Sequence, residues 1–482
     1  MKFKYFLVLF IIAMLFLSSG CGSSSSSSGS GTSGNETISE ENTGNNDSTE
    51  GETETNTNTE NGNTGTDTDT DDNTSTGTAP NVSDITVEHT ASATASGTHA
   101  LEADGTTAAY SNYRIVKTGS PTTASSIKAN TPPSSNGGSS NNSDNYDFYG
   151  TNAAVLASNS GTLTLTDSIV STDGAYANAV FAYGATVNVK NCVIITSSRN
   201  SGGIMTTGGG TMNATNLRVT TSGGSSAPIR SDRGGGTVTV NGGVYTASGT
   251  GSPAIYSTAD ITVSNADLIA KASQGVVIEG SNSVTLNNCE VSASHTTLNG
   301  SQTTRKQAVM IYQSGSGDAS EGKGTFTMKN GSITNSQGDI FYVTNTTADI
   351  TINDIDITNN STDIFLRAES AGWGSSGSNG GKANLYANDQ TIDGDIIVDS
   401  SSAVNMYLAE GSAFSGTVNG DNSGGNVYVS VAGESKWTLT GNSYVTALTC
   451  GTDSINLNSY TLYVNGTAYT SGTSSTGTAI SF

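Results

Sequence analysis

The chain has 482 residues, of which 59 are glycine and 12% are charged, and its net charge at neutral pH is −23. An acidic balance of this size argues against nucleic acid as a partner, because binding a phosphate backbone takes an excess of Lys and Arg. The four cysteines form no Cys-x-x-Cys pair and no Cys/His cluster, which excludes the common zinc motifs. We therefore expect no nucleic-acid partner, no bound metal and no cofactor.

Residues 1–20 have the order of charged, apolar and small residues that an export signal has. A basic start precedes an apolar run from Tyr5 to Leu17, which is too short to span a bilayer as a permanent helix. The ending resembles the lipobox of bacterial lipoproteins, with Ser18 where Leu is usual. That resemblance implies that Cys21 is acylated and anchors the protein to a membrane. An ordinary secretory signal, with Cys21 incidental, is the alternative.

Residues 21–79 are nearly all Ser, Gly, Thr, Asn, Asp and Glu, so they cannot bury enough apolar surface to fold. We interpret them as an acidic low-complexity linker. A coil of this composition spans roughly 40 Å on average and roughly 190 Å when fully extended, which would hold a domain away from a membrane surface. The acidic side chains also repel the linker from anionic lipid.

Residues 80–150 are predicted to cap the N-terminal end of the fold that follows. The segment from Tyr110 to Tyr149 contains several aromatic and aliphatic residues. Stacked repeat proteins need such a terminal cover, because an open end invites end-to-end association.

Residues 151–435 are predicted to form the coils of one fold. From Leu163 to Ile357 they repeat one short pattern, in which apolar and polar residues alternate before a small polar turn, and after Phe365 the pattern weakens although strands continue. Successive copies begin 24, 25, 26, 23, 23, 42 and 24 residues apart, at Leu163, Val187, Met212, Val238, Ile261, Val284, Phe326 and Ile350. Short alternating strands with a period in the low twenties are typical of a solenoid. A second apolar cluster precedes nearly every copy, so we predict two or three strands per coil. The expected fold is all-β, a right-handed parallel β-helix, since crossovers between parallel strands favour that hand.

The fifth position of the repeat is Asn or Asp in every copy except one, which has Gly242. Asn tolerates left-handed backbone, and its amide can bond the same group one coil away. We therefore interpret these residues as a structural ladder at a bend and assign them no catalytic role. They are Asp167, Asn191, Asn216, Asn265, Asn288, Asn330 and Asp354.

Cys192 and Cys289 hold the same position in coils four apart, which is roughly 19 Å at the usual strand spacing of about 4.8 Å. A disulfide needs Cα atoms within about 7 Å of each other. We therefore predict that these two cysteines do not pair and that stacking alone holds the fold together.

Three long loops interrupt the coils at the same point, at 230–236, 313–324 and 367–382, so they are expected to emerge along one side. Arginines lie there beside carboxylates, and a Trp lies on a glycine-rich loop, a combination that can bind sugar rings. The alternative is a surface ion-pair cluster of little energetic value, with the Trp folded back as a lid. Residues 294–307, with His295, Arg305 and Lys306, form a second and weaker candidate corner. The candidate binding residues are Arg230, Asp232, Arg233, Glu279, Arg367, Glu369 and Trp373.

Residues 436–482, with strands at Trp437 and Leu462, resemble the closing coils of β-helical bacterial surface proteins and autotransporter passengers. Trp437 is expected to seal the open end of the core.

The expected fold also resembles that of pectate lyases and polygalacturonases, so an extracellular polysaccharide lyase or glycoside hydrolase is the alternative function. A lyase of that kind needs clustered carboxylates for calcium, and a hydrolase needs two carboxylates roughly 5–10 Å apart. The outward strand positions of the repeat are Thr, Asn, Ser and Lys, without a carboxylate pair, and we assign no catalytic residue.

With its signal, linker and rod, the chain resembles adhesin-like surface lipoproteins. That resemblance implies a non-enzymatic, lipid-anchored protein of the bacterial cell envelope, exposed to the exterior, that binds a glycan or a host or neighbouring-cell surface.

Overall fold

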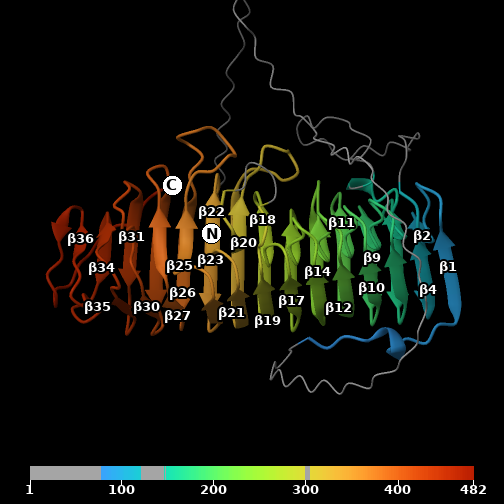
Figure 1. Ribbon diagram of the computed structural model, residues 1–482, viewed down its shortest axis with the longest axis horizontal. Helices are drawn as coiled ribbons and strands as arrows, with labels where there is room; N and C mark the ends of the chain where they lie inside the picture. Colours follow the sequence, from blue (N-terminus) through green and yellow to red (C-terminus); the bar gives the residue numbers. More distant parts are fainter. Residues whose placement is uncertain (1–76, 121–145, 147, 299–303) are drawn as a thin grey trace, which may run out of the picture. The chain divides into compact units, whose positions relative to one another are not determined.

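The computed structural model describes residues 77–120, 146, 148–298 and 304–482. The predicted signal peptide, Cys21 and nearly all of the predicted linker lie outside these residues. The elements with assigned bounds in the described ranges are the 3-10 helix η1 (Val82–Asp84) and the strands β1 to β37. The strands form coils that stack in chain order, from β1 to β36 (Figure 1). In the described part of the chain, no helix has the length and apolar content needed to cross a membrane.

One side of the coils is an eleven-stranded parallel sheet, which we call sheet 1. Each of its strands pairs with the strand one coil away, as β13 does with β11 and β15. Its strands are β2 (Leu101–Asp104), β5 (Val155–Ser158), β8 (Val180–Tyr183), β11 (Ile204–Thr207), β13 (Ile229–Ser231), β15 (Ile255–Ser257), β18 (Val276–Glu279), β20 (Gln307–Tyr312), β22 (Asp339–Thr344), β25 (Ile364–Ala368) and β28 (Asp395–Val398).

The other two sides, sheets 2 and 3, are joined because four long strands bend across both. Sheet 2 contains β3 (Thr107–Ser111), β6 (Thr162–Thr166), β9 (Thr186–Lys190), β12 (Gly210–Thr221), β14 (Gly236–Ala247), β16 (Asp260–Ser264), β19 (Ser283–Ala293), β21 (Lys323–Asn335), β23 (Thr347–Asn353), β26 (Lys382–Asn388), β29 (Ala403–Ala409), β31 (Asn426–Val431) and β34 (Ala447–Cys450). Sheet 3 contains the far ends of β12, β14, β19 and β21 with β1 (His89–Ala93), β4 (Tyr113–Lys117), β7 (Ile169–Thr172), β10 (Val193–Thr196), β17 (Asp267–Ala270) and β24 (Asp356–Asn359).

Two smaller sheets complete the C-terminal coils. One is parallel and contains β27 (Thr391–Asp393), β30 (Ala413–Ser415), β32 (Lys436–Thr438) and β35 (Ile455–Asn456). The other contains β33 (Ser443–Val445), β36 (Leu462–Val464) and β37 (Thr467–Ala468), of which β36 and β37 are antiparallel.

The predicted fold class is confirmed, because the strands pair in parallel with the period read from the sequence. The first residue of each predicted copy pairs with the first residue of the next, as Leu163 does with Val187 and Val187 with Met212. The 42-residue interval obeys the same rule, since Val284 pairs with Phe326. The additional residues therefore leave the stack as loops and do not shift its register. The chain is a parallel β-helix.

The core is a narrow column of inward side chains. Aliphatic residues alternate with outward polar ones, and Phe326, Phe341 and Phe365 stack in successive coils with ring centroids 5.4 Å apart. The expectation that Trp437 seals the end is wrong. Trp437 is fully buried one coil before the end, because Ile455 of β35 pairs over it.

The predicted ladder at the bend between sheets 2 and 3 is confirmed. All seven Asn and Asp residues have φ between 49° and 57°, and Gly242 has φ 74°. The Asn288 amide donates to Asn265 Oδ1 at 2.9 Å, and the Asn191 amide donates to Asp167 Oδ1 at 3.1 Å. Where Gly242 interrupts the ladder, Asn265 donates to Asn241 Oδ1 instead, at 2.8 Å.

A second ladder, which the sequence did not reveal, fixes the turn that enters sheet 1. The Ser201 backbone N–H donates to Ser226 Oγ at 2.9 Å, and the Ser226 N–H donates to Ser252 Oγ at 2.8 Å. All three serines are fully buried. Satisfied polar groups of this kind hold the turn rigid.

The described cysteines Cys192, Cys289 and Cys450 are free and buried, as predicted for the first two. Burial raises the pKa of the Cys192 thiol to about 12 and that of Cys289 to about 11.

Candidate functional site

The three predicted loops leave the stack at one edge of sheet 1. Residues 232–235 join β13 to β14, residues 313–322 join β20 to β21, and residues 369–381 join β25 to β26. We call these three loops the ridge. The second and third, yellow and orange in Figure 1, rise from the same edge of the stack. The seven candidate residues therefore share one side of the molecule.

Strand alternation places the candidate residues of sheet 1 on its outer face. Arg230 lies beside Ile229, which is fully buried in the core, and is in register with Tyr256 of the next coil. Glu279 is in register with Tyr312 by the same pairing. The outer face of sheet 1 thus brings charged and aromatic side chains side by side.

Glu279 is the centre of a buried hydrogen-bonded cluster, although its side chain belongs to the outer face. It is 1% exposed, and its Oε2 accepts the hydroxyls of Tyr256 at 2.7 Å and Tyr312 at 2.8 Å. Its Oε1 accepts the hydroxyls of Ser314 and Ser316. Burial, with the Glu279 charge adding to it, raises the pKa of both tyrosines well above the usual value. Their hydroxyls therefore remain protonated donors, and the second ridge loop is fixed to sheet 1.

Arg230 and Asp232 form a buried ion pair with a distance of 2.9 Å between Nη2 and Oδ2. Asp232 Oδ1 also accepts the backbone N–H of Arg233 at 3.0 Å. Buried charges of this kind are stable only when paired and hydrogen-bonded. The pair fixes the orientation of both side chains on the outer face.

Arg233 connects segments that are distant in sequence. Its Nε lies 2.6 Å from Asp318 Oδ1 of the second ridge loop, and its guanidinium lies 4.1 Å from the ring centroid of Phe148. Cation–π and ionic contacts thus act on the same side chain. Arg233 thus connects the Phe148 segment with the Asp318 loop.

Arg367 and Glu369 lie in a second network of ion pairs. This network joins the ridge to the weaker candidate corner at residues 294–307, which the sequence analysis treated as separate. Arg367 Nε lies 2.6 Å from Asp339 Oδ2, and its Nη1 lies 3.4 Å from Glu369 Oε2. Arg305, from the weaker corner, makes two hydrogen bonds to Glu369, at 2.6 and 3.2 Å. This network ties the third ridge loop to β22 and to residues 304–307.

Trp373 packs against the outer face of sheet 1. Its ring centroid lies 4.9 Å from that of Tyr312, and it covers an apolar cluster of Val277, Met310 and Tyr342 outside the core. The side chain is half-buried. Trp373 therefore folds back onto the sheet as a lid, which is the alternative that we gave for it from the sequence.

The residues at the centre of the outer face line a hollow of about 320 Å³, which we call the tyrosine groove. Phe148, Asp318 and residues of the turn fixed by the serine ladder form its wall. The lining residues are Phe148, Asn200, Ser225, Ala227, Arg230, Asp232, Gly251, Pro253, Tyr256, Tyr312 and Asp318.

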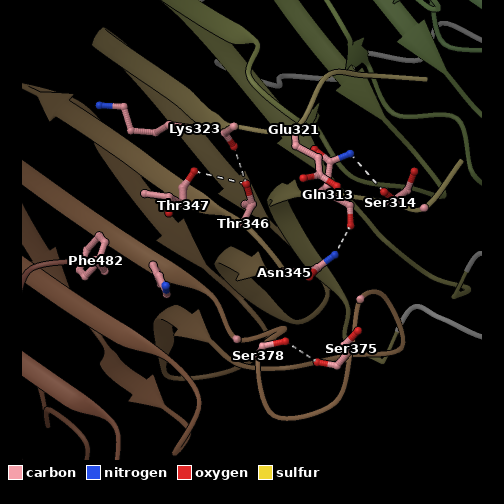
Figure 2. Close-up of a pocket in the computed structure, with 15 residues that line it drawn as sticks. Gln313, Ser314, Glu321, Lys323, Asn345, Thr346, Thr347, Ser375, Ser378 and Phe482 are labelled. Atoms are coloured by element: carbon pink, nitrogen blue, oxygen red, sulfur yellow. Dashed lines mark hydrogen bonds between the residues drawn. The ribbon is translucent and has the colours of Figure 1, made fainter. Parts of the chain in front are cut away.

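A larger hollow of about 720 Å³, which we call the lysine groove, lies between the second and third ridge loops (Figure 2). Figure 2 shows Lys323, Thr347 and Phe482 along one side of it and Ser314 and Glu321 on the other. The lining residues are Gln313, Ser314, Gly315, Glu321, Gly322, Lys323, Asn345, Thr346, Thr347, Gly374, Ser375, Ser378, Gly380, Lys382 and Phe482.

Comparison with protein-family models, with curated proteins and with solved structures gave no match to this chain. Within the described ranges, no three His, Cys, Asp or Glu side chains come close enough together to hold a metal ion.

Sequence reasoning missed Tyr256, Tyr312 and Asp318. Tyr256 ends one of the apolar clusters that we predicted to be strands, and Tyr312 directly follows another. The alternation of inward and outward side chains along a strand could have distinguished these tyrosines from core residues. Tyr256, for example, follows the inward Ile255 and must therefore point outward. Asp318 carries no comparable signal, since its contact with Arg233 spans 85 residues and depends on how the loop folds.

Proposed function

We propose that this protein is a lipid-anchored, non-enzymatic surface protein that binds a glycan in the tyrosine groove. The observation that carries the proposal is the lining of that groove. Phe148, Tyr256, Tyr312 and Pro253 supply apolar and aromatic surface, while Arg230 supplies a hydrogen-bond donor. Sugar-binding sites combine such surface with a few convergent polar groups.

The charges of the groove favour an uncharged, hydroxyl-rich ligand. Arg230 pairs with Asp232, and Arg233 pairs with Asp318, so each charge at the groove has an opposite partner. The Glu279 cluster holds Tyr256 and Tyr312 in place before any ligand arrives. Binding then requires little ordering of side chains, which favours affinity.

The proposed attachment follows from residues 1–21. A bacterial lipoprotein with an acylated Cys21, followed by the acidic linker, would present the β-helix at the cell exterior. Replacing Cys21 by Ala should move the protein from the membrane fraction to the soluble fraction and abolish labelling with a radioactive fatty acid. Membrane attachment that survives Cys21→Ala would contradict the anchor.

A glycan array probed with the full chain tests the binding proposal. Arg233→Ala should weaken binding, because the Phe148 segment and the Asp318 loop lose their common contact. Arg114→Ala removes an exposed arginine of sheet 3 and is the matched control. Equal binding by both variants and the unaltered protein would exclude the tyrosine groove.

One observation favours a second candidate, a polysaccharide hydrolase or lyase. Asp232 and Asp318 line the same groove, which provides the pair of carboxylates that the repeat positions lack. Both carboxylates are engaged by arginines, which is why we prefer binding. Assays for new reducing ends and for ultraviolet-absorbing unsaturated ends across a polysaccharide panel discriminate the two. We expect neither product; release that Asp318→Asn abolishes would establish the enzyme.

A further inference from the structure

The stack holds the backbones of two lysines that line the lysine groove at a fixed spacing. Lys323, Thr347 and Lys382 occupy the same register position on β21, β23 and β26. Adjacent strands lie about 4.8 Å apart, so the backbones of the two lysines are held roughly 10 Å apart, with Thr347 between them. Both side chains line the groove. The spacing is set by the stack and does not depend on loop conformation.

The two lysines differ in their surroundings. Lys323 forms an ion pair with Asp349, and Asp349 also accepts the amide of Asn384 at 2.8 Å. The ion pairs among the described residues do not include Lys382. Lys382 therefore brings a positive charge to the groove wall of a chain whose net charge is −23.

The remaining walls of the lysine groove are rich in hydroxyl and amide groups. Ser314, Thr346, Thr347, Ser375 and Ser378 contribute hydroxyls. The Asn345 amide, which donates to the backbone oxygen of Gln313 at 2.7 Å, also lines the groove (Figure 2). In contrast to the tyrosine groove, this groove offers hydrogen bonds and positive charge in place of an aromatic floor.

We propose that the lysine groove binds an anionic saccharide segment, with a carboxylate or sulfate on Lys382 and sugar hydroxyls on the serine and threonine side chains. An ammonium group binds such oxygens through charge-assisted hydrogen bonds, which are stronger than neutral ones. The site is separate from the tyrosine groove and takes a ligand of different charge. The inference therefore goes beyond the proposed function and is independent of it.

Glu321 should affect the affinity for an anionic ligand in the opposite direction to Lys382. It is exposed and lines the same groove, so its charge repels an anionic ligand. Removing this charge should strengthen binding, whereas removing the Lys382 charge should weaken it. A ligand held by hydroxyl contacts alone would respond to neither change.

The test is a calorimetric titration of the full chain with three probes at physiological salt. An alginate octasaccharide carries carboxylates, a κ-carrageenan octasaccharide carries sulfates without carboxylates, and cellohexaose is neutral. We expect one or both anionic probes to bind in a manner that depends on Lys382, whereas any binding of cellohexaose should not depend on it. Lys382→Gln should lower the affinity of the bound anion about tenfold, and Glu321→Gln should raise it severalfold.

Lys271→Gln is the matched control, because it removes an exposed lysine outside the groove. Binding of alginate alone assigns the anion as a uronate, and binding of carrageenan alone assigns it as a sulfate ester. The proposal is overturned if neither anion binds, if Lys382→Gln lowers the affinity for cellohexaose as much as that for the anion, or if Lys271→Gln lowers the affinity for the anion as much as Lys382→Gln. Absence of neutral-glycan binding in the tyrosine groove would leave these outcomes unaffected.

Discussion

At the scale of single residues, the bend between sheets 2 and 3 combines two requirements in one side chain. The backbone must adopt a left-handed conformation, and the side chain must bond to the coil beneath. Asn288 meets both, with φ 52° and an amide bond of 2.9 Å to Asn265. Few residue types tolerate that conformation, and among them Asn also supplies the donor.

Replacing Asn288 by Ala should therefore lower the free energy of unfolding by about 2 kcal/mol, because the left-handed strain and the lost hydrogen bond add. Asn288→Gly is the matched control. It relieves the strain and loses only the bond, so its loss should be about half as large. Urea unfolding followed by circular dichroism measures both variants. Equal losses would show that backbone strain has no part in the choice of Asn.

His295 makes stability depend on pH. Burial lowers its pKa to about 4, from an ordinary value of about 6.5. Between pH 4 and pH 6.5, the His295 imidazole is therefore protonated in the unfolded chain but largely neutral in the folded chain. Stability from this group is complete above pH 6.5 and is lost as the pH falls towards 4, by about 2 kcal/mol at pH 4.5.

His295→Leu removes this titration. Its free energy of unfolding should decline less between pH 7 and pH 4.5 than that of the unaltered protein, by about 2 kcal/mol. Urea unfolding at the two pH values measures the difference. The same decline in both proteins would mean that His295 is accessible to protons in the folded state.

At the scale of elements, Glu279 determines where the second ridge loop lies. Four hydroxyls converge on its carboxylate, two from sheet 1 tyrosines and two from Ser314 and Ser316 of the loop. One buried group thus connects a strand of the stack to a loop that lines both grooves. Such networks are costly to leave partly satisfied.

Glu279→Gln should lower the free energy of unfolding by about 2 kcal/mol, since an amide NH2 would face hydroxyls that need an acceptor. Hydrogen exchange of residues 314–320 should become faster as the loop loosens. Glu434→Gln makes the same chemical change at an exposed turn and should have neither effect. Unchanged exchange in Glu279→Gln would remove this carboxylate as the anchor of the loop.

The elements differ in how far the sequence predicts them. Coils from Leu163 to Ile357 are readable because each must bury an inward face, and alternation records which residues do so. The edge from which the ridge emerges follows, since each additional segment falls after the same strand. Contacts between loops, such as Arg233 with Asp318 or Arg305 with Glu369, leave no periodic trace. The sequence therefore predicts which side of the β-helix carries the candidate site, but it does not predict the groove that the loops form there.

At the scale of the whole molecule, stability comes from stacking without covalent crosslinks among the described residues. Cys192, Cys289 and Cys450 are free, and burial raises the thiol pKa of the first two to about 12 and about 11. Such thiols are poor nucleophiles, because the thiolate is the reactive form.

Reductant should therefore leave the melting temperature unchanged. Iodoacetamide at pH 8 should leave Cys192 and Cys289 unmodified in the folded protein and alkylate both in urea without prior reduction. Peptide mass spectrometry measures the modification. A lower melting temperature in reductant, or cysteines that react only after reduction, would reveal a crosslink that the stack does not predict.

The most direct test of the central claim is a titration of the neutral glycan that ranks first on the array. Tyr256→Ala removes the aromatic floor of the tyrosine groove and should lower the affinity at least tenfold, since aromatic anchors dominate such sites. Tyr386→Ala removes a tyrosine of sheet 2 that lies outside the groove and should leave the affinity unchanged. Equal affinity of a folded Tyr256→Ala variant and the unaltered protein would contradict glycan binding at this groove.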